Sequence, residues 1–77
     1  MEFTDVIAVT NSSVFNEIAY DEKNYYLRIK MKTGMEYIYD NVPLSVWEGF
    51  KNAHSKGSYY AANIRGKYRT QDTRISR

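Results

Sequence analysis

Residues 25–39, with the sequence YYLRIKMKTGMEYIY, decide the fold of this 77-residue chain. Side chains of residues 25–32 alternate between two faces, which is typical of a β-strand with one covered and one wet side. The covered face would hold Tyr25, Leu27, Ile29 and Met31, and the wet face Tyr26, Arg28, Lys30 and Lys32. Gly34 marks a turn, so the residues after it predict the second strand of a β-hairpin.

The length of this turn decides which face the two following tyrosines occupy, since a one-residue change in register exchanges the faces. A two-residue loop would place Tyr37 opposite Lys30 and Tyr39 opposite Arg28, on the wet face. There the rings, with Tyr26 beside them, could stack on the unpaired bases of a nucleic acid.

A three-residue loop ending at Gly34 would instead turn both tyrosines toward the core, opposite Leu27 and Ile29. Glycine at the last loop position fits this hairpin type, because that position is left-handed. The same register pairs Lys30 with Glu36, which are oppositely charged neighbours across the two strands. We therefore favour the core register, with the hydroxyls at the rim, while the exposed register stays open.

Two shorter strands precede the hairpin. Residues 3–9 are apolar enough for an edge strand, and such an edge could pair with a second copy to give a weak dimer. An Asn-Ser-Ser turn signal separates it from residues 14–20. Alternation in this second strand places Val14, Ile18 and Tyr20 on one face.

A helix is predicted after the hairpin. Pro43 stops the last strand and is acceptable near a helix start. Ser45 and Glu48 have the spacing of a capping box. In a helix over residues 44–55, one face holds Val46, Trp47, Phe50 and Ala53, and this face should cover the sheet.

A second, shorter helix follows. Gly57 is expected to end the first helix, and Ser58 to cap the second, which would run to about residue 65. This helix should bury Ile64 together with either Tyr59 or Tyr60.

These elements predict one α+β domain over residues 1–69, an antiparallel sheet of three to four strands in meander order. One main C-terminal helix and the short second helix would cover it. Residues 70–77 are expected to form a basic, flexible tail.

Composition excludes several kinds of site. The chain has no cysteine and one histidine, His54, so we expect no metal and no cofactor. It has no glycine-rich phosphate loop and no paired-carboxylate motif, so we expect no enzyme. No apolar run approaches the roughly 20 residues of a membrane helix, and the acidic Glu2 and Asp5 are unlike a signal peptide. We expect a cytoplasmic protein.

The positive charge is concentrated near the C-terminus. Residues 1–63 hold six Lys or Arg and eight Asp or Glu, a net charge of −2, whereas residues 64–77 hold five Lys or Arg and one Asp, a net charge of +4. Basic residues interleaved with tyrosine and glycine suit phosphate and base contacts. The predicted nucleic-acid-binding residues are Lys56, Arg65, Lys67, Tyr68 and Arg69, with Tyr26, Tyr37 and Tyr39 as possible stacking residues.

Other interpretations of these basic residues stay open. They could form a solvated tail that keeps the protein soluble, or contact a protein partner. Arg65 could also form an internal ion pair with Asp40 or Glu48.

An ordered set of short motifs spans residues 9–68. It comprises Ser12-Ser13, Ile18-Ala-Tyr20-Asp21, Leu27-x-Ile29-x-Met31, Gly34, Tyr37-x-Tyr39, Val42-Pro43, Ala53-x-Ser55-x-Gly57-x-Tyr59 and Asn63-Ile64-Arg65-x-x-Tyr68. This set resembles the KTSC domain, a small module at the C-terminus of some lysyl-tRNA synthetases and a stand-alone bacterial or phage protein. The resemblance implies the fold and supports the core register. Its synthetase context implies binding of RNA or another single-stranded nucleic acid, and its phage context implies a module that docks on a host protein.

Overall fold

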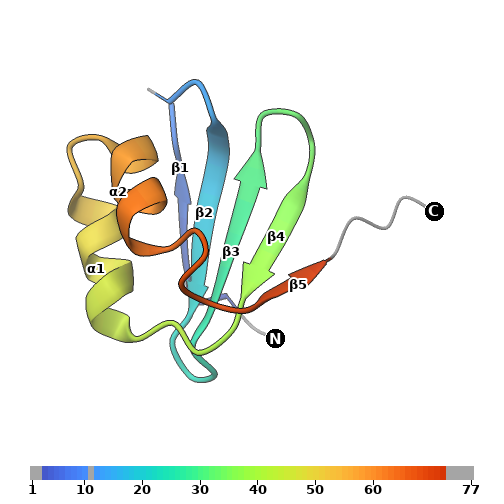
Figure 1. Ribbon diagram of the computed structural model, residues 1–77, viewed down its shortest axis with the longest axis vertical. Helices are drawn as coiled ribbons and strands as arrows, with labels where there is room; N and C mark the ends of the chain where they lie inside the picture. Colours follow the sequence, from blue (N-terminus) through green and yellow to red (C-terminus); the bar gives the residue numbers. More distant parts are fainter. Residues whose placement is uncertain (1–2, 11, 73–77) are drawn as a thin grey trace.

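The computed structural model describes residues 3–10 and 12–72, which form an antiparallel sheet and two helices (Figure 1). The elements are β1 (Asp5–Ala8), β2 (Phe15–Asp21), β3 (Tyr26–Met31), β4 (Glu36–Tyr39), α1 (Leu44–Asn52), α2 (Lys56–Asn63) and β5 (Thr70–Asp72). The sheet order is β1-β2-β3-β4-β5. The predicted α+β class and meander order are confirmed, with one strand more than the three or four expected.

The hairpin of β3 and β4 has the three-residue loop. Leu27 pairs with Tyr39 and Ile29 with Tyr37, so both tyrosines lie on the face that carries the core. Gly34 has a φ of +96°, which is the left-handed conformation that the loop requires. The core register is therefore confirmed, and the exposed register is wrong.

A β-bulge in β2 changes which residues enter the core. The register with β3 shifts between Phe15 and Glu17. The extra residue brings Phe15 onto the same face as Ile18, and both are fully buried. The prediction that Val14 faces the core is wrong, because Val14 precedes the strand and is 44% exposed.

The turn between β2 and β3 also differs from the prediction. Tyr25 was expected on the covered face, but it lies in the turn with a φ of 62° and is half exposed. Asp21 is buried and accepts hydrogen bonds from the backbone N–H groups of Lys23 (3.1 Å) and Asn24 (3.2 Å). Asp21 thus caps the turn, and β3 begins at Tyr26, one residue later than predicted.

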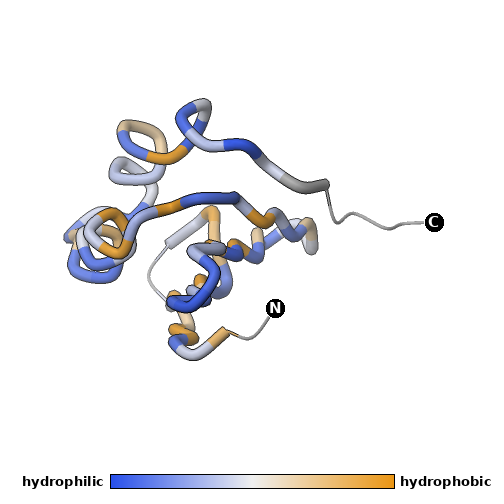
Figure 2. The backbone as a smooth tube through the Cα atoms, turned by 90° about the horizontal axis from the view of Figure 1, so that it is seen from below, coloured by the Kyte–Doolittle hydropathy of each residue, from blue (hydrophilic) through white to orange (hydrophobic). Residues whose placement is uncertain are grey.

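The core lies between the sheet and the helices, whose backbones lie on separate sides when the molecule is seen from below (Figure 2). As predicted, α1 contributes Trp47 and Phe50, and both are buried. The Trp47 ring stacks on Tyr20 of β2, with 5.3 Å between centroids, and Phe50 meets Phe15 edge to face at 5.9 Å. These aromatic contacts attach α1 to β2, the strand next to the sheet edge.

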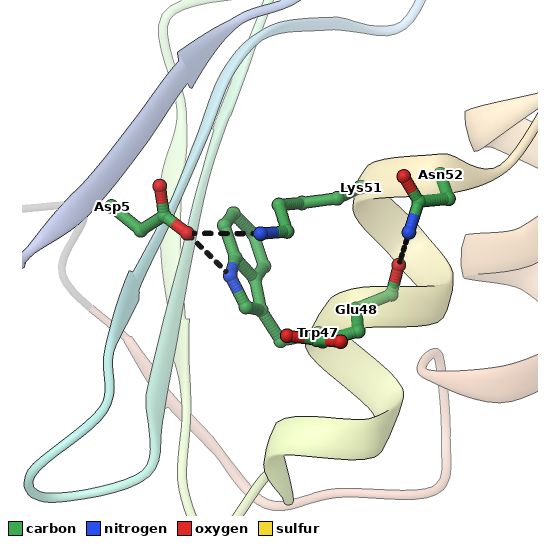
Figure 3. A network of polar contacts seen from close by, with 5 residues as sticks. All are labelled: Asp5, Trp47, Glu48, Lys51 and Asn52. Atoms are coloured by element: carbon green, nitrogen blue, oxygen red, sulfur yellow. Dashed lines mark hydrogen bonds and ion pairs between the residues drawn. The ribbon is translucent and has the colours of Figure 1, made fainter.

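A polar network ties α1 to the edge strand β1 (Figure 3). One carboxylate oxygen of Asp5 accepts from the Trp47 indole Nε1 at 3.0 Å and from the Lys51 ammonium at 3.3 Å. The buried indole thus keeps its only donor satisfied.

The helix starts differ from the capping prediction. Pro43 occupies the N-cap of α1, which has no side-chain cap, and Ser45 lies inside the helix, so the predicted capping box does not form. The second helix begins earlier than expected, because Ser55 and not Ser58 is its N-cap. The Ser55 hydroxyl accepts from the Ser58 backbone N–H at 3.3 Å. Gly57 accordingly lies within α2 rather than ending α1.

The last strand, β5, was not expected. It pairs antiparallel with β4, and Thr70 lies opposite Tyr39. The prediction of a flexible tail from residue 70 is therefore wrong for residues 70–72, and residues 73–77 lie outside the described part of the chain. In Figure 1, β5 lies at one edge of the sheet, and the two helices are drawn near the opposite edge.

Candidate functional site

A groove with a volume of about 620 Å³ opens beside β4, between the sheet and the segment that links α2 to β5. We call it the tyrosine groove. Its lining residues are Val14, Met31, Tyr37, Tyr39, Tyr60, Arg65, Gly66 and Thr70. Three aromatic rings and one guanidinium therefore share a single concave surface, which makes it the candidate binding site.

The rings are held by the sheet and by α2. The pleat of β4 directs Tyr37 and Tyr39 to the helix side of the sheet. Tyr60 comes from α2, packs edge to face on Phe15 with 5.4 Å between centroids, and meets Tyr39 at 6.1 Å. The hydroxyls of Tyr39 and Tyr60 are 2.5 Å apart and share a hydrogen bond. The groove wall is therefore preorganised by contacts within the protein.

The Tyr39 phenol is electrically neutral in this setting. Its burial, and then its hydrogen bond with Tyr60, raise the pKa of Tyr39 well above the usual value of 10.0, while the Thr70 side chain opposes the increase. The hydroxyl therefore stays protonated at physiological pH and can act as both donor and acceptor.

Arg65 reaches the groove because of the way α2 ends. Ile64 is fully buried and fixes the end of the helix, and Gly66 takes a φ of +76° directly after Arg65. The Arg65 side chain is exposed. None of the ion pairs found within residues 3–10 and 12–72 joins Arg65 to Asp40 or Glu48, the alternative that the sequence left open.

The remaining predicted basic residues are placed in two different ways. Lys67 and Arg69 are exposed on the link between α2 and β5, and the half-buried Tyr68 between them packs against the core. Lys56 lies elsewhere, since its ammonium donates to the backbone carbonyls of Lys51 (3.0 Å) and Ala53 (3.3 Å) at the end of α1. Lys56 therefore has a structural contact and is not part of the groove.

The outer face of the sheet is not a second cationic platform. Arg28 forms ion pairs with Glu17 at 2.7 Å and with Glu36 at 3.4 Å, and its guanidinium lies 4.7 Å from the centre of the Phe3 ring. These carboxylates offset its charge. Tyr26, predicted as a stacking residue, belongs to this outer face and does not meet the other tyrosines.

The structure thus brings Tyr37, Tyr39 and Arg65 of the predicted site together and adds residues that the sequence reasoning missed. Tyr39, however, is only 4% exposed, so its ring offers little surface for the predicted stacking. The sequence predicts only that Tyr59 or Tyr60 is buried in the core. Adjacent residues of a helix point in different directions, so the pair itself indicates that the two rings contact different neighbours. Thr70 was assigned to a tail. A strand of three residues gives no periodicity from which its pairing could be read.

Among the described residues, no group of three or more His, Cys, Asp or Glu side chains is placed to hold a metal ion. The helices in the same part of the chain are too short or too polar to cross a membrane.

Comparison with protein families identifies residues 11–68 as a match to the family described as the KTSC domain. A crystal structure of a KTSC domain protein from Yersinia pestis superposes with a TM-score of 0.83 at 31% sequence identity. The match covers 88% of this chain and 94% of the solved one.

Two relatives are named lysine–tRNA ligase. The protein from Nostoc punctiforme is 38% identical over 69 residues, and the one from Trichormus variabilis is 36% identical over 69 residues. Each match covers 84% of this chain but only 12% of the relative, so the similarity concerns one small part of each enzyme.

Proposed function

This chain belongs to the KTSC domain family, and we propose that it is a non-catalytic cytoplasmic module that binds RNA or another single-stranded nucleic acid. The observation that carries the proposal is the tyrosine groove, where aromatic rings and the Arg65 guanidinium line one surface. Rings supply stacking surfaces for unpaired bases, and a guanidinium supplies a contact for phosphate.

The charges around the groove support the proposal. Arg65, Lys67 and Arg69 are all exposed and follow one another at every second residue after α2. The cations of residues 1–63 are outnumbered by acidic residues, whereas these three lie in the basic end of the chain. A phosphate backbone that passes the groove would therefore meet its cations on the link between α2 and β5.

The relatives add support of a different kind. Two of them are named for joining lysine to tRNA, so RNA is a substrate of those enzymes. A module found within such enzymes would act in the presence of tRNA. Because only 12% of each relative is matched, their catalytic activity is not proposed for this chain.

The second candidate function is a protein-interaction module, and one observation favours it. Tyr25 is 50% exposed and Leu44 is 40% exposed, and they line a cleft of about 360 Å³ together with Asn41 and Pro43. Both Tyr25 and Asn41 have positive φ angles. These residues lie on two segments that are joined by a hydrogen bond from the Val42 N–H to the Tyr25 carbonyl at 2.9 Å. Exposed apolar side chains on such neighbouring segments suit a protein partner, including the host protein that a phage factor would contact.

Salt dependence separates the two functions. Fluorescence anisotropy with labelled single-stranded RNA, repeated from low to high salt, should give a log–log slope of about −0.7 per neutralised phosphate. Arg65→Ala combined with Lys67→Ala should weaken binding and make the slope shallower.

The matched control is Lys23→Ala combined with Lys30→Ala, which removes the same charge from positions outside the groove. The control should retain most of the affinity and the slope. If RNA does not bind at low salt, or if the two double variants lose equal affinity, nucleic-acid binding at this site is rejected.

A further inference from the structure

Four residues that line the tyrosine groove carry hydroxyls, and three of these residues lie next to one another. Tyr39 and Tyr60 are joined at 2.5 Å, and Thr70 lies directly opposite Tyr39 in the neighbouring strand. All three residues line the groove. We call them the hydroxyl trio.

The hydroxyl trio has hydrogen-bonding capacity left over. Each hydroxyl carries one donor hydrogen and two acceptor lone pairs. Three hydroxyls hold three hydrogens, and linking them to one another uses at most two, so at least one donor and several lone pairs remain. A ligand hydroxyl, which donates and accepts at once, is the group that such a surface complements.

The placement of Arg65 indicates which part of a nucleotide would reach the trio. Arg65 lies on the same groove as the three rings. A phosphate held by Arg65 and a base held against the exposed part of Tyr37 would leave the connecting sugar facing the rest of the lining, which includes Tyr60 and Thr70. Of the sugar's groups, the 2′-hydroxyl is the one that distinguishes RNA from DNA.

We infer that the tyrosine groove holds a ribonucleotide and that the hydroxyl trio recognises its 2′-hydroxyl, so that the module binds RNA more tightly than DNA of the same base sequence. This inference rests on the proposed nucleic-acid function. Binding of a nucleotide displaces water from the trio. A deoxyribonucleotide has no 2′-hydroxyl to replace the hydrogen bond that the spare donor made with that water. The expected preference is about 2-fold to 10-fold, the effect of one net hydrogen bond.

The test compares oligouridylate with oligodeoxyuridylate of equal length, since the two probes share their base and their charge. The wild-type chain should bind the ribose form more tightly. Tyr60→Phe and Thr70→Val each remove one hydroxyl and nearly preserve the side-chain shape. Each variant should lower the ratio of the two affinities toward one, because it weakens ribose binding more than deoxyribose binding.

Tyr59→Phe is the matched control. It also removes a phenol hydroxyl from α2, but that hydroxyl donates to the Val46 carbonyl at 3.0 Å, away from the groove. The control should keep the wild-type ratio, and a thermal melt of each variant should show a folded domain.

The outcomes separate the two levels of the proposal. Equal binding of both probes by the wild type, or an unchanged ratio in both Tyr60→Phe and Thr70→Val, overturns recognition of the 2′-hydroxyl but leaves nucleic-acid binding in place. Failure to bind either probe at low salt overturns the proposed function and the inference with it.

Discussion

Two glycines of this chain show how the backbone angle, and not the available space, decides the effect of a side chain. A Cβ added at Gly34 or at Gly57 would meet no heavy atom within 4 Å. Gly34 has a φ of +96°, whereas Gly57 lies within α2. The same substitution should therefore have opposite effects at the two positions.

Gly34→Ala should lower the free energy of unfolding by about 1 kcal/mol, because an L side chain is strained in the left-handed region. Gly57→Ala should raise it by up to about 1 kcal/mol, because alanine favours the helix. Urea unfolding of both variants measures the difference. Equal shifts of the same sign would mean that the loop does not require the left-handed conformation.

Asp5 predicts how stability depends on pH. The indole N–H of Trp47, and after it the Lys51 ammonium, hold the pKa of Asp5 below 3.8, although partial desolvation opposes them. Because the folded-state pKa is the lower one, the stabilisation is present above pH 3.8 and is lost as the pH falls through the folded-state pKa.

Asp5→Asn should therefore lower the melting temperature at pH 7, and the gap from the wild type should narrow in acid. The Asp5 side chain is 44% exposed, so the effect of losing its charge should be within the range of exposed ion pairs, about 0.2–1 kcal/mol. Melting curves between pH 2 and pH 7 test this. A gap that stays constant with pH would show that the carboxylate charge has no part in holding β1.

At the scale of elements, the contact between α1 and α2 depends on a missing side chain. The Tyr59 ring stacks on Phe50 with 5.7 Å between centroids and an interplanar angle of 15°. A Cβ at Gly49 would overlap the Tyr59 hydroxyl oxygen and lie 2.9 Å from its Cζ atom. The second helix can therefore pack this closely only because α1 has a glycine at this position.

Gly49→Ala should destabilise the wild-type protein despite the better helix propensity of alanine. In a Tyr59→Ala background the same change should stabilise by about 0.5–1 kcal/mol, since only the propensity gain remains. A double-mutant cycle measured by denaturant unfolding gives the coupling. Additive effects would show that the two helices do not meet at this point.

The elements also show what the sequence could predict. The hairpin register followed from Gly34 and from the pairing of Lys30 with Glu36, because turn geometry and cross-strand charge agree there. The apolar spacing of α1 placed Trp47 and Phe50 correctly in the core. These are local signals that tertiary contacts did not override.

Features that depend on one residue or on distant contacts were missed. The bulge in β2 shifts the alternation and exchanges Val14 for Phe15 in the core, and no pattern in the strand itself marks it. Both Ser55 and Ser58 are suitable caps, and the end of α1 decides between them. The sequence singled out Tyr37 and Arg65 separately and predicted no groove, because their meeting depends on the path of the chain between them.

For the whole molecule, β5 should contribute both stability and one wall of the site. A chain ending at Arg69 lacks β5 and leaves the backbone of β4 unpaired on that side. We expect a lower melting temperature and weaker RNA binding, because Thr70 and its pairing with Tyr39 are lost. For a domain of this size, each 1 kcal/mol lost should lower the melting temperature by about 4–8 °C.

A chain ending at Asp72 is the control, because it retains β5. Calorimetry should give it a melting temperature close to that of the full chain. If the two truncated chains melt together, β5 does not stabilise the sheet.

The lining of the tyrosine groove includes Val14, which precedes β2, and Thr70, which belongs to β5. The ribosome therefore translates Val14 well before Thr70. Under the proposed function, a nascent chain could not form the complete groove until β5 has left the exit tunnel. Under the proposed function, a translation product that stops before Thr70 would lack one of the groove residues and should bind RNA more weakly than a product that includes β5.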